Sequence, residues 1–244
     1  MSFYQDLSPI YDDMINFSDR LESEKKVFEN FLNNYPASDV LDAGCGSGFH
    51  TILLSQLKLK MTGMDNSTAM LDLAEKNAMD HQESPTFIKN DFLTLNPTLK
   101  NRFDAIFCLG NSFVHLLSEK DQIMALSNFD DYLRSPGYLC LQIVNYDKIL
   151  KDRQQILAVR NVDNKMITRM YAFNKSTVTF TVKVESSEGC REISTELYPL
   201  QSEEILSLVE RAGFNNAGLY GDLKLNPYQR YTSANICIIC SHTD

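Results

Sequence analysis

Apolar and polar positions follow two alternating rhythms over the first 145 residues of the chain. Short apolar runs of strand length are followed by longer stretches in which apolar residues recur at helical spacing. Strands that alternate with helices in this way predict an α/β fold with a parallel, doubly wound sheet. The predicted strands cover 39–43, 60–64, 86–89, 103–109 and 137–144, and the predicted helices cover 49–57, 67–80 and a segment that follows Ser118.

The rhythm changes after Asn145. Three segments (165–173, 177–185 and 191–198) place apolar residues at every second position, which predicts a small inserted antiparallel β-sheet. A helical pattern then returns over 200–212, with Ser202 as its expected cap. The last two predicted strands, 217–220 and 233–240, complete the main sheet.

These patterns predict three regions. Residues 1–149 form the core domain, and their N-terminal part, up to Asn34, is predicted as two helices that act as a lid. Residues 150–198 form the inserted β cap over a substrate, and residues 199–244 complete the core sheet. The chain has 244 residues, of which 43% are hydrophobic, enough for one α/β domain with such an appendage.

Composition narrows the possible partners. A net charge of −9 argues against capture of a nucleic-acid backbone and favours a small-molecule substrate, without excluding RNA. No apolar run approaches the roughly 20 residues of a membrane-spanning helix, and the N-terminus lacks the features of a signal peptide, so we expect a cytoplasmic protein. The six cysteines fall mostly within apolar runs and are predicted to be core residues, with no metal site.

The segment Val40-Leu41-Asp42-Ala43-Gly44-Cys45-Gly46-Ser47-Gly48 carries the strongest functional signal. An apolar run ends in an acid, and three glycines follow at every second position, which predicts a buried strand, a tight turn and the start of a helix. Glycines allow a positive φ and the close approach of a ligand to the backbone. Phe49 stands where an NAD-binding motif has its third glycine, so an NAD-dependent oxidoreductase is disfavoured.

Three further features are predicted at the carboxyl ends of neighbouring strands, where open parallel sheets bind ligands. Asp65 ends the second strand, where a carboxylate can accept hydrogen bonds from a ribose diol or cap the next helix. Asp91 and Phe92 follow the third strand and suit an adenine base. The segment Leu109-Gly110-Asn111-Ser112 follows the fourth strand.

This ordered set resembles the pattern of the class I S-adenosylmethionine (SAM) dependent methyltransferases, which implies a seven-stranded Rossmann-like sheet. Residues 103–116 and 145–150 are similar to the corresponding segments of glycine N-methyltransferases and glycine/sarcosine methyltransferases. The resemblance implies SAM as cofactor, S-adenosylhomocysteine as product, and transfer of a methyl group to a small-molecule acceptor through an amine nitrogen.

The resemblance also assigns residues by position. Arg20 matches the arginine that holds the SAM carboxylate, and Tyr4 and Tyr11 are placed like aromatic residues that close over SAM. Asn111 is a catalytic candidate that could orient the substrate amine, with Ser112 beside it; His115 could relay a proton, but a cofactor contact is favoured. The full set of expected cofactor contacts is Tyr11, Arg20, Asp42, Ala43, Gly44, Gly46, Asp65, Asn66, Met70, Asp91, Phe92, Leu109, Gly110 and His115.

One position departs from the family. The arginine that binds glycine in the family stands just before Asn145-Tyr146-Asp147, and this chain has Val144 there. Valine cannot supply a bidentate anchor for a carboxylate. Either the acceptor has no carboxylate at this place or another arginine holds it; Arg160, Arg169 and Arg230 are the candidates, unless they are solvated surface residues.

Other functions stay open at this stage. A SAM-binding protein without activity would keep the same cofactor residues. Methylation of RNA or protein is a second alternative, although the Asp/Asn-Pro-Pro-Tyr/Phe segment of nucleic-acid amino methyltransferases is absent after the fourth strand. Cys108 lacks the preceding proline of a cytosine-C5 nucleophile. The sequence fixes neither the acceptor nor the oligomeric state.

Overall fold

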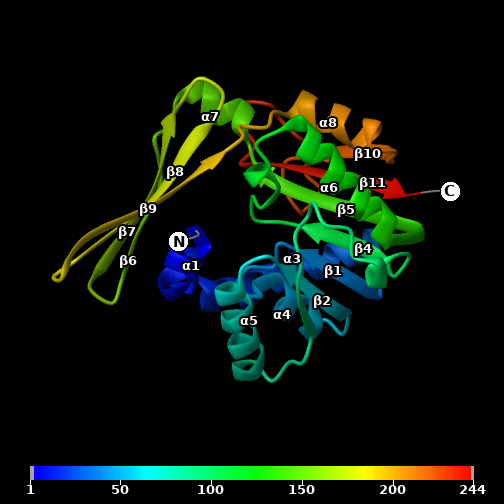
Figure 1. Cartoon of the computed structure of the whole chain (residues 1–244), viewed down its shortest axis with the longest axis horizontal. Helices are drawn as coiled ribbons and strands as arrows, with labels where there is room; N and C mark the ends of the chain where they lie inside the picture. Colours follow the sequence, from blue (N-terminus) through cyan, green and yellow to red (C-terminus); the bar gives the residue numbers. More distant parts are fainter. Residues whose placement is uncertain (1–2, 243–244) are drawn as a thin grey trace.

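The structure, a computed structural model, describes residues 3–242 and contains two β-sheets that lie beside each other (Figure 1). The larger sheet has the order β10-β11-β5-β4-β1-β2-β3. Strands β1 to β5 are mutually parallel, whereas β11 runs antiparallel to both β5 and β10. The bounds are β1 Asp39–Ala43, β2 Lys60–Asp65, β3 Thr86–Lys89, β4 Phe103–Cys108, β5 Leu133–Val144, β10 Asn215–Tyr220 and β11 Asn235–His242.

The order of this sheet determines where a ligand can bind. The chain adds β2 and β3 on one side of β1 and places β4 on the other side, so the direction of winding reverses between β1 and β4. The connections that leave the two strands go to opposite faces of the sheet. A crevice therefore opens at the carboxyl ends of β1 and β4, the expected binding site of an open α/β sheet.

Helices cover both faces of the larger sheet because successive strand residues point to opposite sides. Leu41 and Ile106 pack into one cluster with α6 and α8, while their neighbours Val40 and Phe107 pack into another with α3 and α4. Strands that are buried on both faces read as continuous apolar runs. The helices are α3 Phe17–Asn34, α4 Phe49–Gln56, α5 Thr68–Asp80, α6 Glu119–Tyr132, α7 Tyr146–Asp152 and α8 Ser202–Arg211, with the 3-10 turns η2 Pro97–Leu99 and η3 Phe113–His115.

The smaller sheet is antiparallel, and the N-terminal helices pack against it. Its strands, in the order of the sheet, are β6 Ile156–Val162, β7 Lys165–Phe173, β8 Val178–Ser186 and β9 Gly189–Leu197. The N-terminal elements are α1 Phe3–Leu7, η1 Ser8–Ile10 and α2 Tyr11–Ile15. An apolar cluster joins these elements to α5 and the small sheet; it consists of Leu7, Met14, Met70, Ile167, Val182 and Ile193.

Two polar contacts hold the same parts together. Asp6 of α1 forms an ion pair with Arg191 of β9 at 3.0 Å. Asn16, which follows α2, accepts a hydrogen bond from Arg160 of β6 at 2.5 Å. In Figure 1 the dark-blue N-terminal helices accordingly lie next to the small sheet and beside the larger one. The N-terminal segment therefore bridges the two sheets.

The predicted fold class is confirmed, with local corrections. The small sheet has a fourth strand, β6, that the pattern did not predict. The N-terminal segment, predicted as two helices, contains a short 3-10 turn and three helices. The residue that caps α8 is Gln201 and not Ser202, because the Gln201 and Glu204 side chains form a reciprocal capping box. The three-region division stays a prediction.

Three findings bear on other classes of site or segment. Five of the six cysteines are buried and Cys190 is exposed. Among residues 3–242, no group of three or more His, Cys, Asp or Glu side chains is placed to hold a metal ion. The described helices include none with the length and apolar character needed to cross a membrane.

Candidate active site

The glycine-rich turn after β1 is closely packed by two other segments. Gly44 and Gly46 both have positive φ, +79° and +54°. A side chain at Gly44 would place its Cβ 2.8 Å from the Cβ of Ser112, and one at Gly46 would come within 3.2 Å of the Tyr11 hydroxyl. The Gly44 N–H donates to the Met64 carbonyl at 2.7 Å, which fixes the turn on β2. Glycine is required here by both conformation and space.

Asp65, at the end of β2, faces this turn. Its Oδ2 accepts a hydrogen bond from the Gly46 N–H at 2.9 Å, and its Oδ1 accepts one from the Ser67 N–H at the same distance. Burial raises the pKa of Asp65. A carboxylate offers about four lone-pair sites, so Asp65 keeps acceptor capacity for a ligand. The turn, rather than the helix alone, determines where this carboxylate points.

A first cavity opens over the turn. The structure brings together at it residues from the ends of β1, β2, β3 and β4, as the sequence predicted from the parallel topology. Two N-terminal aromatic residues, Tyr4 and Tyr11, close it from the other side. The predicted residues that line it are Tyr4, Tyr11, Gly44, Gly46, Asp65, Asn66, Asp91, Phe92, Ser112 and His115.

A second cavity, of about 430 Å³, lies next to the first. This volume falls within the range of roughly 300–1,000 Å³ that is usual for small-molecule sites. It shares Tyr11, Gly44 and Ser112 with the first cavity, so these three residues stand where the two meet. Its other predicted lining residues are Arg20, Leu109, Gly110, Asn111 and Arg169, and Val144 lies in the same wall.

Some predicted residues lie outside both cavities. Asp42 is buried behind the turn, where it accepts a hydrogen bond from Thr51 Oγ1 at 2.6 Å, and burial raises its pKa. Ala43 and Met70 are fully buried. These three residues can support the cofactor region only from behind, through packing.

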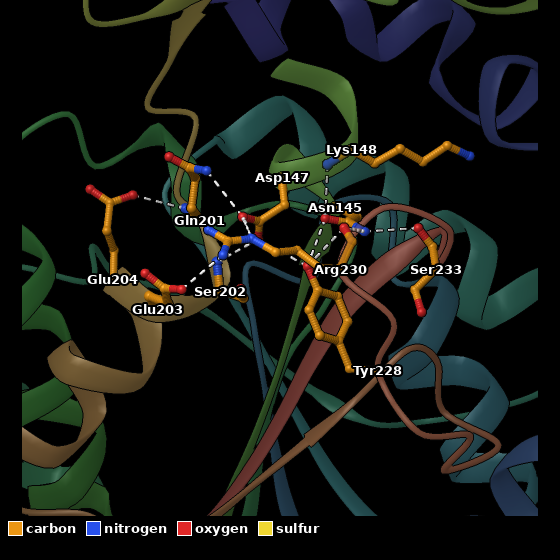
Figure 2. Close-up of polar contacts among 10 residues, drawn as sticks. All are labelled: Asn145, Asp147, Lys148, Gln201, Ser202, Glu203, Glu204, Tyr228, Arg230 and Ser233. Atoms are coloured by element: carbon orange, nitrogen blue, oxygen red, sulfur yellow. Dashed lines mark hydrogen bonds and ion pairs between the residues drawn. The ribbon is translucent and has the colours of Figure 1, made fainter. Parts of the chain in front are cut away.

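Arg230 is also outside both cavities, and its guanidinium already has acidic partners. It donates from Nε to Asp147 at 2.8 Å and from its terminal nitrogen to Glu203 at 2.9 Å (Figure 2). The structure therefore does not bring Arg230 to a place where it could hold an acceptor.

Comparison with known proteins agrees with this arrangement. Residues 40–137 match the family described as "Methyltransferase domain". A glycine/sarcosine N-methyltransferase from Halorhodospira halochloris is 30% identical over 226 residues, which are 88% of this chain and 79% of that protein. The chain belongs to the class I SAM-dependent methyltransferases, in the glycine/sarcosine N-methyltransferase branch.

Further similarities support the same class. Human glycine N-methyltransferase is 27% identical over 243 residues, covering 87% of this chain and 82% of the relative. A SAM-dependent methyltransferase from Clostridium acetobutylicum has the same fold, with a TM-score of 0.78 at 19% identity and full coverage of both chains. A SAM-bound amino pentose methyltransferase from Micromonospora echinaspora gives 0.69 at 17% identity, over 96% and 97% of the two chains. SAM is the cofactor of this methyltransferase.

Asn111 of the methyltransferase lies in the wall of the second cavity with its side chain held at both ends. Its φ is +76°, and its Oδ1 accepts a hydrogen bond from the Val144 N–H at 3.0 Å. Its Nδ2 donates to the Tyr146 hydroxyl at 3.0 Å, and this hydroxyl lies 3.1 Å from that of Tyr171 on β7. Asn111 is thus fixed to the core and linked through Tyr146 to the small sheet.

Hydrogen bonds explain why the residues Asn145-Tyr146-Asp147 occur together at the start of α7. Asn145 caps α7 by accepting from the Lys148 N–H. Asp147 is buried, and its carboxylate binds α8 and the 228–233 segment, as Figure 2 shows. Its four donors are Gln201 Nε2, the Ser202 N–H, the Tyr228 hydroxyl and Arg230 Nε. The outer two members of the motif therefore fix the start of α7, which directs Tyr146 to Asn111.

His115 lies at the first cavity beside Tyr4. Its Nε2 and the Tyr4 hydroxyl are hydrogen-bonded at 2.8 Å. Burial lowers the pKa of His115 to about 4 and raises that of Tyr4 well above its usual range. Both groups are uncharged at neutral pH, so this end of the methyltransferase site offers a neutral surface rather than a charge.

Several residues that line the cavities of the methyltransferase were not expected from the sequence. Glu24 holds Arg20 through Nε at 2.7 Å; although burial acts to raise its pKa, hydrogen bonds from His50 and Arg20 hold that pKa at about 2. The spacing of Arg20 and Glu24, four apart on α3, was a usable signal. Asn90, Leu93 and Leu116 line the first cavity without a comparable local pattern.

Proposed function

We propose that the protein transfers the methyl group of SAM to the nitrogen of a small-molecule amine. The observation that carries this proposal is the pair of adjoining cavities, one at the glycine turn and one at Asn111, which meet at Tyr11, Gly44 and Ser112. Methyl transfer requires adjoining sites for SAM and for the acceptor, because the methyl carbon and the attacking nitrogen must come within contact distance.

The first cavity fits the nucleoside part of SAM. The bare backbone at Gly44 and Gly46 accepts close approach of a ligand, and Asp65 retains acceptor capacity for ribose hydroxyls. Asp91, Asn66 and Phe92 would surround the base, and Asp42, Ala43 and Met70 support the turn from behind. Arg20, Leu109 and Gly110 would hold the remaining part of SAM from the second cavity.

SAM supplies a methyl group that is activated by the positive charge of its sulfonium. The protein must therefore align the acceptor, exclude water from it and keep its nitrogen unprotonated. Asn111 Oδ1 already accepts from Val144 but has a second lone pair, which can orient an amine N–H. His115 is neutral and bonded to Tyr4, which favours a cofactor contact over proton transfer.

Two observations favour a small acceptor over RNA or protein. The second cavity is bounded by the small sheet through Arg169 and by the N-terminal helices through Tyr11 and Ile15. Relatives in the branch carry names that specify glycine and sarcosine, and a structural neighbour is named for an amino pentose. A small amine is the acceptor class common to these proteins.

Incubation of the purified protein with isotopically methyl-labelled SAM and a panel of small amines tests the proposal. Glycine, sarcosine, simple alkylamines and amino sugars belong in the panel, with product detection by mass spectrometry. We expect label in at least one amine, together with S-adenosylhomocysteine. Saturable SAM binding with no labelled amine would favour a SAM-binding protein without activity. Label found only in RNA or protein would favour a methyltransferase that acts on macromolecules.

A further inference from the structure

Arg169 occupies an unusual place on the small sheet. It lies on β7 between Ile167 and Tyr171, and alternate residues of a strand share one face. Ile167 and Tyr171 are both buried, and Val182, which is directly opposite Arg169 on β8, is buried as well. Arg169 therefore projects from the inner, apolar face of this sheet into the second cavity.

The guanidinium of Arg169 has no anionic partner. Within the described residues it forms neither a hydrogen bond nor an ion pair. Arg20, in the same cavity, instead has Glu24 at 2.7 Å and stacks over the Phe49 ring. Burial lowers the pKa of Arg169, and the charges of Arg20 and Arg160 act in the same direction. Removing a cation from water without a partner is costly, so this position favours an anionic ligand.

Another residue of this cavity supplies the complementary group. Asn111 lines the cavity as well, and so does Val144, which contributes no charge. The Asn111 side chain is held by the Tyr146 hydroxyl, which is hydrogen-bonded to that of Tyr171, two residues from Arg169. The cavity thus presents both an amide that can orient an amine and a guanidinium without an anionic partner, and Tyr146 and Tyr171 connect the segments that carry them.

We propose that Arg169 binds the carboxylate of the methyl acceptor, so that the acceptor is an amino acid or another amine that bears a carboxylate. The inference rests on the function proposed above and names its substrate class. A guanidinium binds both oxygens of a carboxylate with parallel N–H donors, and it binds a neutral amide less well. The small sheet, rather than the core strand that carries Val144, then selects the acceptor.

Binding measurements separate this inference from turnover. Calorimetric titrations would use protein saturated with S-adenosylhomocysteine and a panel of amino acids and N-methyl amino acids, each paired with its carboxamide. In the unmodified protein we expect at least one acid to bind about 10-fold or more tightly than its amide. Arg169→Met should abolish this preference and leave SAM affinity unchanged.

Matched variants control for damage to the fold. Arg153→Met removes an exposed arginine at the end of α7, outside both cavities, and should leave the preference for acids intact. Val144→Arg, added to Arg169→Met, returns a guanidinium to the same cavity from β5 and should restore part of the preference. A circular dichroism melt of each variant verifies folding.

Two results would overturn the inference. One is equal affinity for every acid and its amide in the unmodified protein. The other is an acid preference that survives in Arg169→Met; a loss of SAM affinity in that variant would then assign Arg169 to the cofactor. Methyl transfer is measured separately. Transfer to amines without a preference for acids leaves the proposed function standing, whereas an Arg169-dependent preference without transfer refutes only that function.

Discussion

The two cavities of the methyltransferase differ in the origin of their walls. The first is built mainly from the carboxyl ends of β1 to β4, and its turn is fixed by backbone hydrogen bonds to β2. The second shares the segments that follow β1 and β4 and adds residues from α2, α3, α4, β5, β7 and the segment around 222–224. Apart from its N-terminal aromatic residues, the first cavity is thus built by one sheet, whereas the second also depends on the small sheet and on other distant segments.

This difference separates two kinds of specificity. Cofactor residues such as Asp65 are held by the same strands that form the core, so changing them affects the fold and the cofactor together. Arg169 lies on an inserted sheet that can change without altering the turn at Gly44. The acceptor can therefore differ among proteins that share the core. Substitutions in the first cavity should change cofactor binding, and substitutions in the second cavity should change the use of the acceptor.

The largest effect is expected at the first cavity. Gly44→Ala combines a positive φ, which costs a non-glycine residue about 1–2 kcal/mol, with a Cβ placed 2.8 Å from that of Ser112. We expect the free energy of unfolding to fall by about 2–5 kcal/mol, since overpacking adds a further ~1–3 kcal/mol, and SAM affinity to fall as well. Gly213→Ala has a similar strain but no neighbour within 4 Å. Equal losses in both variants, by chemical denaturation, would show that crowding at the turn is unimportant.

Replacement of the carboxylate at the end of β2 is expected to have the second-largest effect. Asp65→Ala removes an acceptor from the Gly46 and Ser67 N–H groups and should weaken SAM binding by about 1–3 kcal/mol. Asp72→Ala, on the exposed face of the following helix, is the matched control and should bind SAM normally. Unchanged calorimetric SAM affinity in Asp65→Ala would remove this residue from the cofactor site.

The second cavity should respond through turnover rather than through cofactor binding. Asn111→Ala breaks the contacts to Val144 and Tyr146, and displacement of an acceptor by about 1 Å can cost on the order of 100-fold in rate. We expect kcat to fall by about 10- to 100-fold, with a smaller change in SAM affinity. Equal losses of kcat and SAM affinity would place Asn111 with the cofactor. Tyr146→Phe, which removes only the hydroxyl, should show a milder loss of the same kind.

The smallest effect concerns pH. Because burial holds the pKa of His115 at about 4, its imidazole is neutral throughout the range from pH 6 to pH 8. We therefore expect kcat/KM to show no inflection from His115 within this range and to feel its protonation only below about pH 5. An inflection near pH 6.5 that disappears in His115→Gln would show that the imidazole titrates during the reaction, and would revive its role as a base.

The core could be predicted closely because its signals are local. The bounds of β1 and β3 matched the prediction, since an apolar run and the glycines or polar residues that end it are adjacent in sequence. The strand β6 was missed for a physical reason. A register shift between Ile156 and Ala158 interrupts its period-two pattern, and Ile156 and Val159 are exposed although apolar. The N-terminal helices were merged because Asn16 ends α2 in a left-handed conformation that no strong sequence signal announced.

The residues of the second cavity were harder to predict, because they come from segments that are brought together only by the tertiary fold. Three arginines were equal candidates from sequence, but only Arg169 lines the second cavity, while Arg230 pairs with Asp147 and Arg160 with Asn16. One local signal favoured Arg169. In the predicted strand it lies on the same face as the apolar residues Ile167 and Tyr171, since alternate residues of a strand share one face. The two partners of Arg230 are distant in sequence, Asp147 by 83 residues and Glu203 by 27, and no local pattern indicates them.

The N-terminal segment has a consequence for the catalytic cycle. Its Tyr4 and Tyr11 close the first cavity, and the segment is held to the small sheet by Asp6, Asn16 and an apolar cluster. Movement of this segment would widen the path by which spent cofactor leaves and new cofactor enters. We therefore expect contacts far from the methyl group, between the N-terminus and the inserted strands, to influence how fast the cofactor is exchanged.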